Sequence, residues 1–88
     1  MRLGYFLAMP RYFFDFRSGD TVLPDDDGLD LPDVDAAHGE AIGALADGLR
    51  DVIMIGAKNQ HFAIEVRDDI GPVFEVAAVL GTKILRRQ

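Results

Sequence analysis

The stretch RYFFDFR, residues 11–17, constrains the fold most, because its side chains alternate with the period of a β-strand. Tyr12, Phe14 and Phe16 share one side, which predicts a face buried against a core. The other side holds Phe13 among charged residues. The alternation therefore predicts a half-buried strand that carries an aromatic residue on its less buried face as well.

The segment after this strand predicts a hairpin followed by an acidic loop. The tripeptide SGD is typical of a turn, and residues 21–23 predict a short second strand whose register stays open. Pro24 cannot continue the interior of a strand, so it ends this one. Residues 24–33 are expected to form a loop rich in aspartate, with Leu29 and Leu31 tucked under the core.

Residues 34–53 predict one amphipathic helix. Its apolar positions recur at intervals of three and four residues and so form a single buried stripe. They are Val34, Ala37, Ala41, Ile42, Leu45, Leu49, Val52 and Ile53. Asp33 is suited to cap the N-terminus, and Gly56 is suited to end the helix. Gly43 and Gly48 flank the stripe, which predicts close approach of the helix to a sheet.

The last third of the chain predicts a second hairpin, with strands at 61–67 and 73–79. One register places the apolar sides of both strands on the same face. Its pairs are Ile64 with Val76 and Val66 with Phe74. The connection is then Asp69-Ile70-Gly71, which ends in glycine, as a type I turn closed by a left-handed residue requires. Turn chemistry and hydrophobic pattern thus agree on one register.

The order strand, strand, helix, strand, strand predicts an α+β fold: a two-layer ββαββ arrangement in which one helix covers one face of a four-stranded antiparallel sheet. A chain of 88 residues makes one domain. We expect this domain to span 9–80, with an extension at 1–8 and a basic tail at 81–88. Met9 is the expected natural start, since MRLGYFLA lacks both a signal-peptide cleavage site and the ~20 apolar residues of a membrane span.

The charge balance argues against several classes of partner. The formal net charge is −6, so general binding to nucleic acid or to an anionic membrane is not expected. The chain has no cysteine, which removes thiolate catalysis and cysteine-based zinc sites and fits a cytoplasmic protein. No lysine or arginine lies between Arg17 and Arg50, a stretch rich in aspartate. This stretch is either a solvated loop or a patch that selects a basic partner.

We expect association through the face of the sheet away from the helix or through a strand edge. That face would hold an apolar patch ringed by charge, as protein interfaces commonly do. The candidate residues are Phe13, Ala63, Val73, Ala77 and Val79, with Asp25, Asp26 and Asp27 of the acidic loop selecting a basic partner. The alternative is a scatter of exposed apolar residues, which is common on monomers.

The predicted register also sets Glu65 directly opposite Glu75, and like charges across a strand pair are unfavourable. We expect Arg11 or Arg17 on a neighbouring strand to offset them. The alternative is a small ligand or metal ion held by both glutamates together with His61.

No sequence motif predicts catalysis or a cofactor. The acidic loop fails as an EF-hand, because aligning Gly28 with the invariant glycine puts Leu23 and Val34 at ligand positions. There is no phosphate-binding glycine loop, and the only serine, Ser18, lies in a tight turn. We therefore expect no enzyme activity, no cofactor and no metal centre.

The segments MPRYFFDFRSGD, PDDDGLDLPDVDAA and FAIEVRDDIGPVFEV together resemble a family of small alphaproteobacterial proteins that often open with MPRYFF. The resemblance covers residues 9–79 and implies a bacterial cytoplasmic protein. The family is a domain of unknown function, so it brings no activity, ligand or catalytic residue. We expect a non-enzymatic domain that acts as a homodimer or as an accessory module for another protein. A small-ligand or metal-binding module is the alternative.

Overall fold

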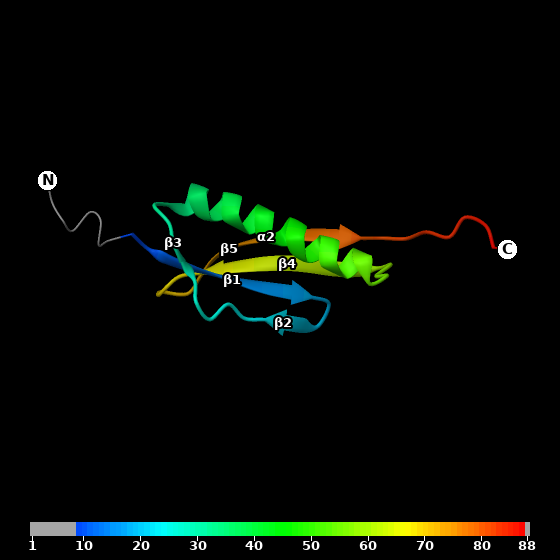
Figure 1. Ribbon diagram of the computed structural model, residues 1–88, viewed down its shortest axis with the longest axis horizontal. Coiled ribbons are helices and arrows are strands. Elements are labelled where there is room, and N and C mark those ends of the chain that lie inside the picture. Colours follow the sequence, from blue (N-terminus) through cyan, green and yellow to red (C-terminus); the bar gives the residue numbers. More distant parts are fainter. Residues whose placement is uncertain (1–8, 88) are drawn as a thin grey trace, which may run out of the picture.

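The computed structural model describes residues 9–87. The helix α2 (Val34–Met54) lies on one face of an antiparallel sheet (Figure 1). The strands are β1 (Arg11–Ser18), β2 (Thr21–Leu23), β3 (Leu29–Asp30), β4 (Gln60–Arg67) and β5 (Pro72–Leu80). The predicted α+β fold, with one helix covering one face of the sheet, is confirmed.

The sheet has five strands where the sequence predicted four. Its order is β2-β1-β4-β5, and β3 also pairs with β1, through Arg11 and Tyr12. The prediction that residues 24–33 are all loop was therefore wrong at Leu29 and Asp30. A strand of two residues is too short to show an alternating pattern, so its pairing cannot be read from its own sequence.

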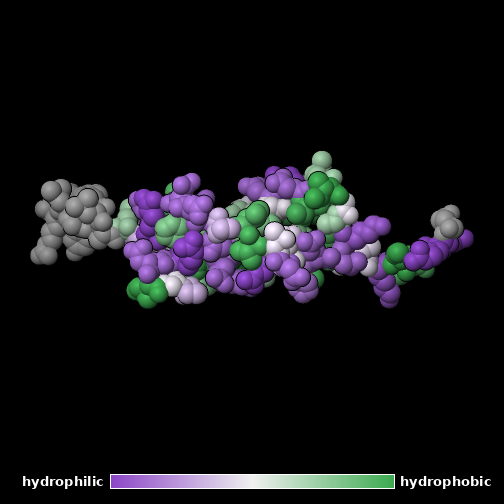
Figure 2. Space-filling view, turned by 90° about the horizontal axis from the view of Figure 1, so that it is seen from below, coloured by the Kyte–Doolittle hydropathy of each residue, from purple (hydrophilic) through white to green (hydrophobic). Residues whose placement is uncertain are grey.

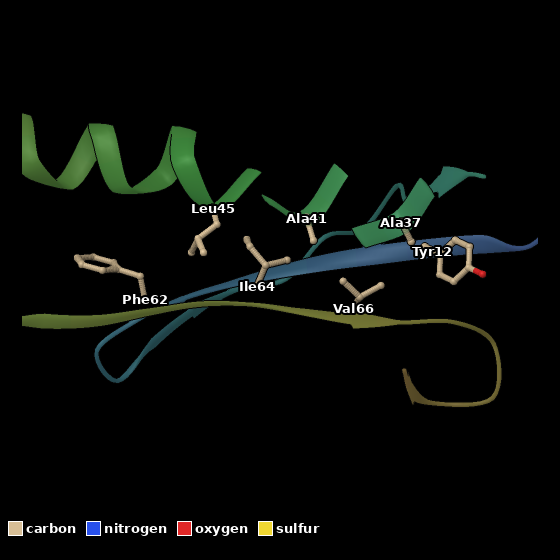
Figure 3. Packing of buried hydrophobic residues seen from close by; sticks show 7 residues of the cluster. All are labelled: Tyr12, Ala37, Ala41, Leu45, Phe62, Ile64 and Val66. Carbon is tan, nitrogen blue, oxygen red and sulfur yellow. The ribbon is translucent and has the colours of Figure 1, made fainter. Parts of the chain in front are cut away.

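The core lies between α2 and the helix-facing side of the sheet (Figure 3). Seven buried side chains form it: Tyr12, Phe62, Ile64 and Val66 from the strands, and Ala37, Ala41 and Leu45 from the helix. Phe14 and Phe16 are half-buried and pack against this cluster. The strand β1 thus turns the predicted aromatic side toward the helix.

Both ends of α2 carry the predicted caps. The side chain of Asp33 accepts a hydrogen bond from Ala36 N at 2.9 Å. Gly56 follows the helix with φ +92°, donating to Ile53 O at 3.0 Å, while Ala57 N donates to Val52 O at 3.2 Å. These two bonds form a Schellman motif, which satisfies the last carbonyl groups of the helix.

The two glycines expected to permit close packing behave differently. A Cβ atom added at Gly48 would lie 2.4 Å from Cε1 of Phe16, so the helix touches the sheet there. A Cβ atom added at Gly43 would meet nothing within 4 Å, so the prediction was wrong for this residue. Leu29 is also 42% exposed rather than tucked under the core, whereas Leu31 packs against it.

The register of the second hairpin is confirmed, but its connection differs from the prediction. Ile64 pairs with Val76, and Val66 pairs with Phe74. The register then shifts, so that Arg67 pairs with Pro72 and the connection has four residues, 68–71. Asp68 stabilises it, since its carboxylate accepts from the backbone N–H groups two and three residues later, at 2.8 and 3.2 Å. This local aspartate bond replaces the predicted glycine-closed turn of three residues.

Residues 81–87 follow β5 without regular secondary structure and lead away from the sheet (Figure 1). The extension predicted at 1–8 lies outside the described residues. Within residues 9–87, no helix combines the length and the apolar character that crossing a membrane requires.

Candidate interaction surface

β5 is one of the two terminal strands in the order β2-β1-β4-β5, and no strand of residues 9–87 covers its outer edge. Three hydrogen bonds reveal which backbone groups point outward. Gly19 N donates to His61 O at 2.9 Å, so His61 turns its backbone groups toward β1. Phe14 N donates to Asp25 Oδ2, and Leu31 N to Pro10 O, so even-numbered residues of β1 turn away from β4.

In an antiparallel pair, the N–H and C=O groups of one residue point the same way, and successive residues alternate. The even-numbered residues of β4 therefore face β5 and bond to their partners there, such as Phe62 to Ala78. It follows that Glu75, Ala77 and Val79 direct their backbone N–H and C=O groups toward the outer edge.

Most of this edge lacks the features that usually block association, because a proline and a bulge are confined to its hairpin end. β5 has nine residues, PVFEVAAVL, with one charged side chain, Glu75, and no lysine. Pro72 and the register shift lie at its hairpin end and leave the rest regular. Val79 is 68% exposed. A long, apolar, unblocked edge strand is a ready template for pairing with another strand.

On the opposite side of the sheet, β1 is flanked by the short strands β2 and β3 and, between them, by the acidic loop. The carboxylate of Asp25 accepts hydrogen bonds from the backbone N–H groups of Phe14, Asp27 and Gly28, at 3.1, 3.1 and 3.2 Å. In return, Asp25 N donates to Asp15 Oδ1 at 2.9 Å. Asp25 thus takes the place of a strand partner for β1, and its carboxylate is already hydrogen-bonded within the chain. Asp26 and Asp27 are exposed.

Arg67, at the end of β4, holds the acidic loop against the sheet by hydrogen bonds. Its Nε donates to Asp15 Oδ2 at 2.8 Å, and its Nη2 donates to Asp25 O at 3.0 Å. The same guanidinium lies 4.5 Å above the ring centroid of Phe13, a cation–π contact. Gly28, with φ +71°, lies against Cδ2 and Cε2 of that ring. The aromatic residue singled out as an association contact is therefore half-buried by its own chain.

The remaining residues of the predicted surface separate into two groups. Ala63, Ala77 and Val79 line one shallow depression on the open face, together with Arg17. Among them, Ala63 is buried, whereas Ala77 and Val79 are exposed. Val73 packs against the core cluster instead, because the register shift takes it out of the alternation.

A row of three carboxylates crosses the open face, because Asp15 pairs with Glu65 and Glu65 pairs with Glu75. Arg67 neutralises Asp15. Of the two arginines expected to offset the glutamates, Arg11 does not, because it instead bonds Asp30 at 2.9 Å.

Arg17 and His61 line the same depression as Glu75. Among residues 9–87, no ion pair includes Glu65 or Glu75. In the same part of the chain, no three His, Asp or Glu side chains are grouped closely enough to hold a metal ion. His61, Glu65 and Glu75 are thus not grouped at metal-binding distances from one another.

The contacts of the acidic loop lower the pKa values of two carboxyl groups, those of Asp15 and Asp25. Burial on its own would raise the pKa of Asp15, but the hydrogen bonds from Arg67 and Asp25 N and the charge of Arg67 hold that pKa below its ordinary value. Burial would likewise raise the pKa of Asp25. Hydrogen bonds from the N–H groups of Phe14, Gly28 and Asp27 outweigh it, so this pKa is lowered too.

These lowered pKa values mean that Asp15 and Asp25 stabilise the folded state when ionised, and we expect this contribution to be lost at low pH. A carboxyl whose folded pKa is lowered stabilises the fold fully above its unfolded pKa of about 4, and the contribution is lost as the pH falls through the folded pKa. Asp25→Ala should therefore flatten the dependence of the free energy of unfolding on pH below about 4. The measurement is urea denaturation at a series of pH values.

Asp26→Ala is the matched control, because its side chain is exposed and makes no hydrogen bond among residues 9–87. It should keep the pH dependence of the unmodified chain. Identical acid curves for Asp25→Ala and the unmodified chain would contradict the assigned role of Asp25.

Comparisons with curated proteins and with solved structures each find no match. A family model described as "Domain of unknown function (DUF6894)" matches residues 11–79. The match runs from the first residue of β1 nearly to the end of β5, and so includes the helix and the acidic loop. The resemblance to an uncharacterised domain family is thereby confirmed. Because the match covers most of its length, the chain belongs to the family of domains of unknown function DUF6894.

Proposed function

We propose that this protein is a non-enzymatic association domain that forms a homodimer through the outer edge of β5. The observation that carries the proposal is the outward direction of the backbone groups of Glu75, Ala77 and Val79 on a nine-residue strand without a blocking lysine. A second copy offers the same edge, and antiparallel pairing about a two-fold axis satisfies these groups on both chains. The two sheets would become one continuous sheet.

Apolar side chains above the edge support this proposal. The ring of His38 lies 5.9 Å from the ring of Phe74, so this flank of α2 lies over β5. At 100° per residue, Ile42 and Ile53 point to the same flank. They are 46% and 47% exposed. Pairing of two β5 edges would bring the corresponding flanks of two helices toward each other and remove part of this apolar surface from water.

The size of the domain makes such a partner useful. A chain of 88 residues buries a smaller share of its surface on folding than larger domains do. The dimer adds buried apolar area and backbone hydrogen bonds without a further domain. Another protein that contributed a strand to the same edge would use the same chemistry, so an accessory role is an extension of this proposal.

Val79→Lys is expected to weaken the dimer at least about tenfold, equivalent to about 1.4 kcal/mol of association free energy. The substitution places a charge on the exposed edge, which is how natural edge strands prevent pairing. Size-exclusion chromatography with light scattering, at several chain concentrations, measures the change.

The matched control is Met54→Lys, the same charge gained at a residue that is 80% exposed at the end of α2 and is not part of β5. This variant should associate like the unmodified chain. The edge would be the wrong surface if Val79→Lys dimerised as tightly as Met54→Lys.

A further inference from the structure

We infer that the C-terminal tail, residues 81–87, lies along the β5 edge of the second copy, with Lys83 beside the partner's Glu75. This inference rests on the proposed dimer and specifies its register. It also assigns a role to a segment that lies beyond the matched family region. The tail carries three cations, Lys83, Arg86 and Arg87, on a chain whose net charge is −6.

Two hydrogen bonds align the tail with β5. Thr82 N donates to Asn59 Oδ1 at 2.8 Å, and Thr82 Oγ1 donates to Lys58 O at 2.7 Å, just before β4 begins. Thr82 thus turns its N–H toward the β4 side, as the even-numbered residues of β5 do. Where the tail continues as a strand, Gly81 and Lys83 extend the outward-facing series of Glu75, Ala77 and Val79.

The tail also exposes apolar side chains. Ile84 and Leu85 are 57% and 84% exposed. Figure 2 shows this segment protruding from the body, with hydrophobic residues (green) next to hydrophilic ones (purple). Along a partner's edge, its extended backbone would gain hydrogen bonds, and these two side chains would gain apolar contacts.

Charge selects the register of the pairing. In an antiparallel pair of identical strands, the numbers of two paired residues add up to a constant, which is twice the number of the residue on the two-fold axis. An axis at Glu75 would set the two glutamates against each other, which is unfavourable. Axes at 76, 77 or 78 would set Glu75 opposite residues without charge. An axis at Val79 sets Glu75 opposite Lys83, with both side chains on the open face. An axis at Gly81 would set Glu75 opposite Arg87, but it would leave no residue of β5 paired with the partner's β5.

The same register matches the rest of the tail to the hairpin end of the partner. Arg86 and Arg87 then lie near the bulge at the hairpin end of β5 in the second copy, next to the acidic connection between β4 and β5. That connection contributes two carboxylates, Asp68 and Asp69. The three cations of each tail therefore lie near three carboxylates of the second copy, namely those at positions 68, 69 and 75. By the two-fold axis, this complementarity occurs twice in the dimer.

Single-cysteine variants test this register, because the chain has no cysteine of its own. Val79→Cys would place two thiols directly opposite each other, where the Cα atoms of a hydrogen-bonded pair lie about 5.5 Å apart, within reach of a disulfide. In Ala77→Cys, the two thiols would be four residues out of register, about 13 Å apart along the strand. In a glutathione redox buffer, we expect Val79→Cys to form a covalent dimer at least tenfold faster than Ala77→Cys.

A charge exchange gives a second readout. Lys83→Glu should weaken the dimer of the full chain at least threefold, and Glu75→Lys in the same chain should restore it. Faster crosslinking of Ala77→Cys, or dimerisation of Lys83→Glu at the strength of the unmodified chain, would overturn the tail pairing and leave the edge dimer in another register. A monomeric unmodified chain with no crosslinking of either variant would overturn both proposals.

Discussion

Replacing Phe62 with alanine is expected to lower the free energy of unfolding by about 3–5 kcal/mol. The ring of Phe62 is 1% exposed and is among the largest fully buried side chains in residues 9–87. It packs in the core cluster that joins β4 to α2 (Figure 3). Native domains are stable by about 5–15 kcal/mol, so a domain of this size should be close to unfolded without the ring. Urea denaturation followed by circular dichroism, at fixed chain concentration, measures the loss.

Phe62→Leu is the matched control, since leucine fills much of the same space and should cost less than half as much as alanine. Fixed concentration is necessary because the stability of a dimer depends on the amount of chain. If Phe62→Ala lowered the free energy of unfolding by less than about 1 kcal/mol, the described core would be contradicted. A loss that small is typical of core substitutions that conserve volume.

Gly28→Ala is expected to lower the free energy of unfolding by about 2–5 kcal/mol, the sum of two effects. Gly28 has φ +71°, a left-handed conformation that costs other residues about 1–2 kcal/mol. A Cβ atom there would also lie 2.8 Å from Cε2 of Phe13 and 2.9 Å from Cγ of Arg11, and such overpacking costs about 1–3 kcal/mol. The measurement is again urea denaturation.

Gly56→Ala separates these effects, because Gly56 has φ +92° and a Cβ atom there would meet nothing within 4 Å. It should show the backbone cost alone. Equal losses for the two variants would mean that the acidic loop does not press on Phe13. A larger loss for Gly28→Ala, together with reduced protection of Phe14 N–H from hydrogen exchange, is the expected result, because that group bonds to Asp25.

The parts of the fold that sequence predicted correctly are those fixed by local chemistry or by strict periodicity. Asp33 caps α2 through a bond to a residue three positions on, which a sequence shows directly. The pairing of Ile64 with Val76 follows from alternation, because a slip by one residue would turn every side chain to the wrong face. The same register correctly placed Glu65 opposite Glu75.

The features that sequence missed depend on residues far apart in the chain. Arg67 bonds Asp15 across 52 positions, and Asp25 bonds Phe14 across 11, so no local pattern reveals that the acidic loop is anchored. The displacement of Val73 into the core follows from a register shift that alternation alone does not show.

The free edge of β5 depends on strand order. β1 lies between β2 and β4, which leaves β5 at the outside of the sheet. The sequence predicted the strands and association through the open face or a strand edge, and the order of the strands identifies β5 as one such edge. Ala77 and Val79, at this edge, are exposed, whereas Phe13 of β1 is half-buried.

The mass of the unmodified chain in solution tests the proposed edge dimer most directly. Sedimentation equilibrium over a roughly hundredfold range of concentration should show the average mass rising from that of one chain, 9.7 kDa, toward twice that value. The rise is expected to disappear in Val79→Lys and to persist in Met54→Lys. A mass of one chain at every concentration would contradict the account.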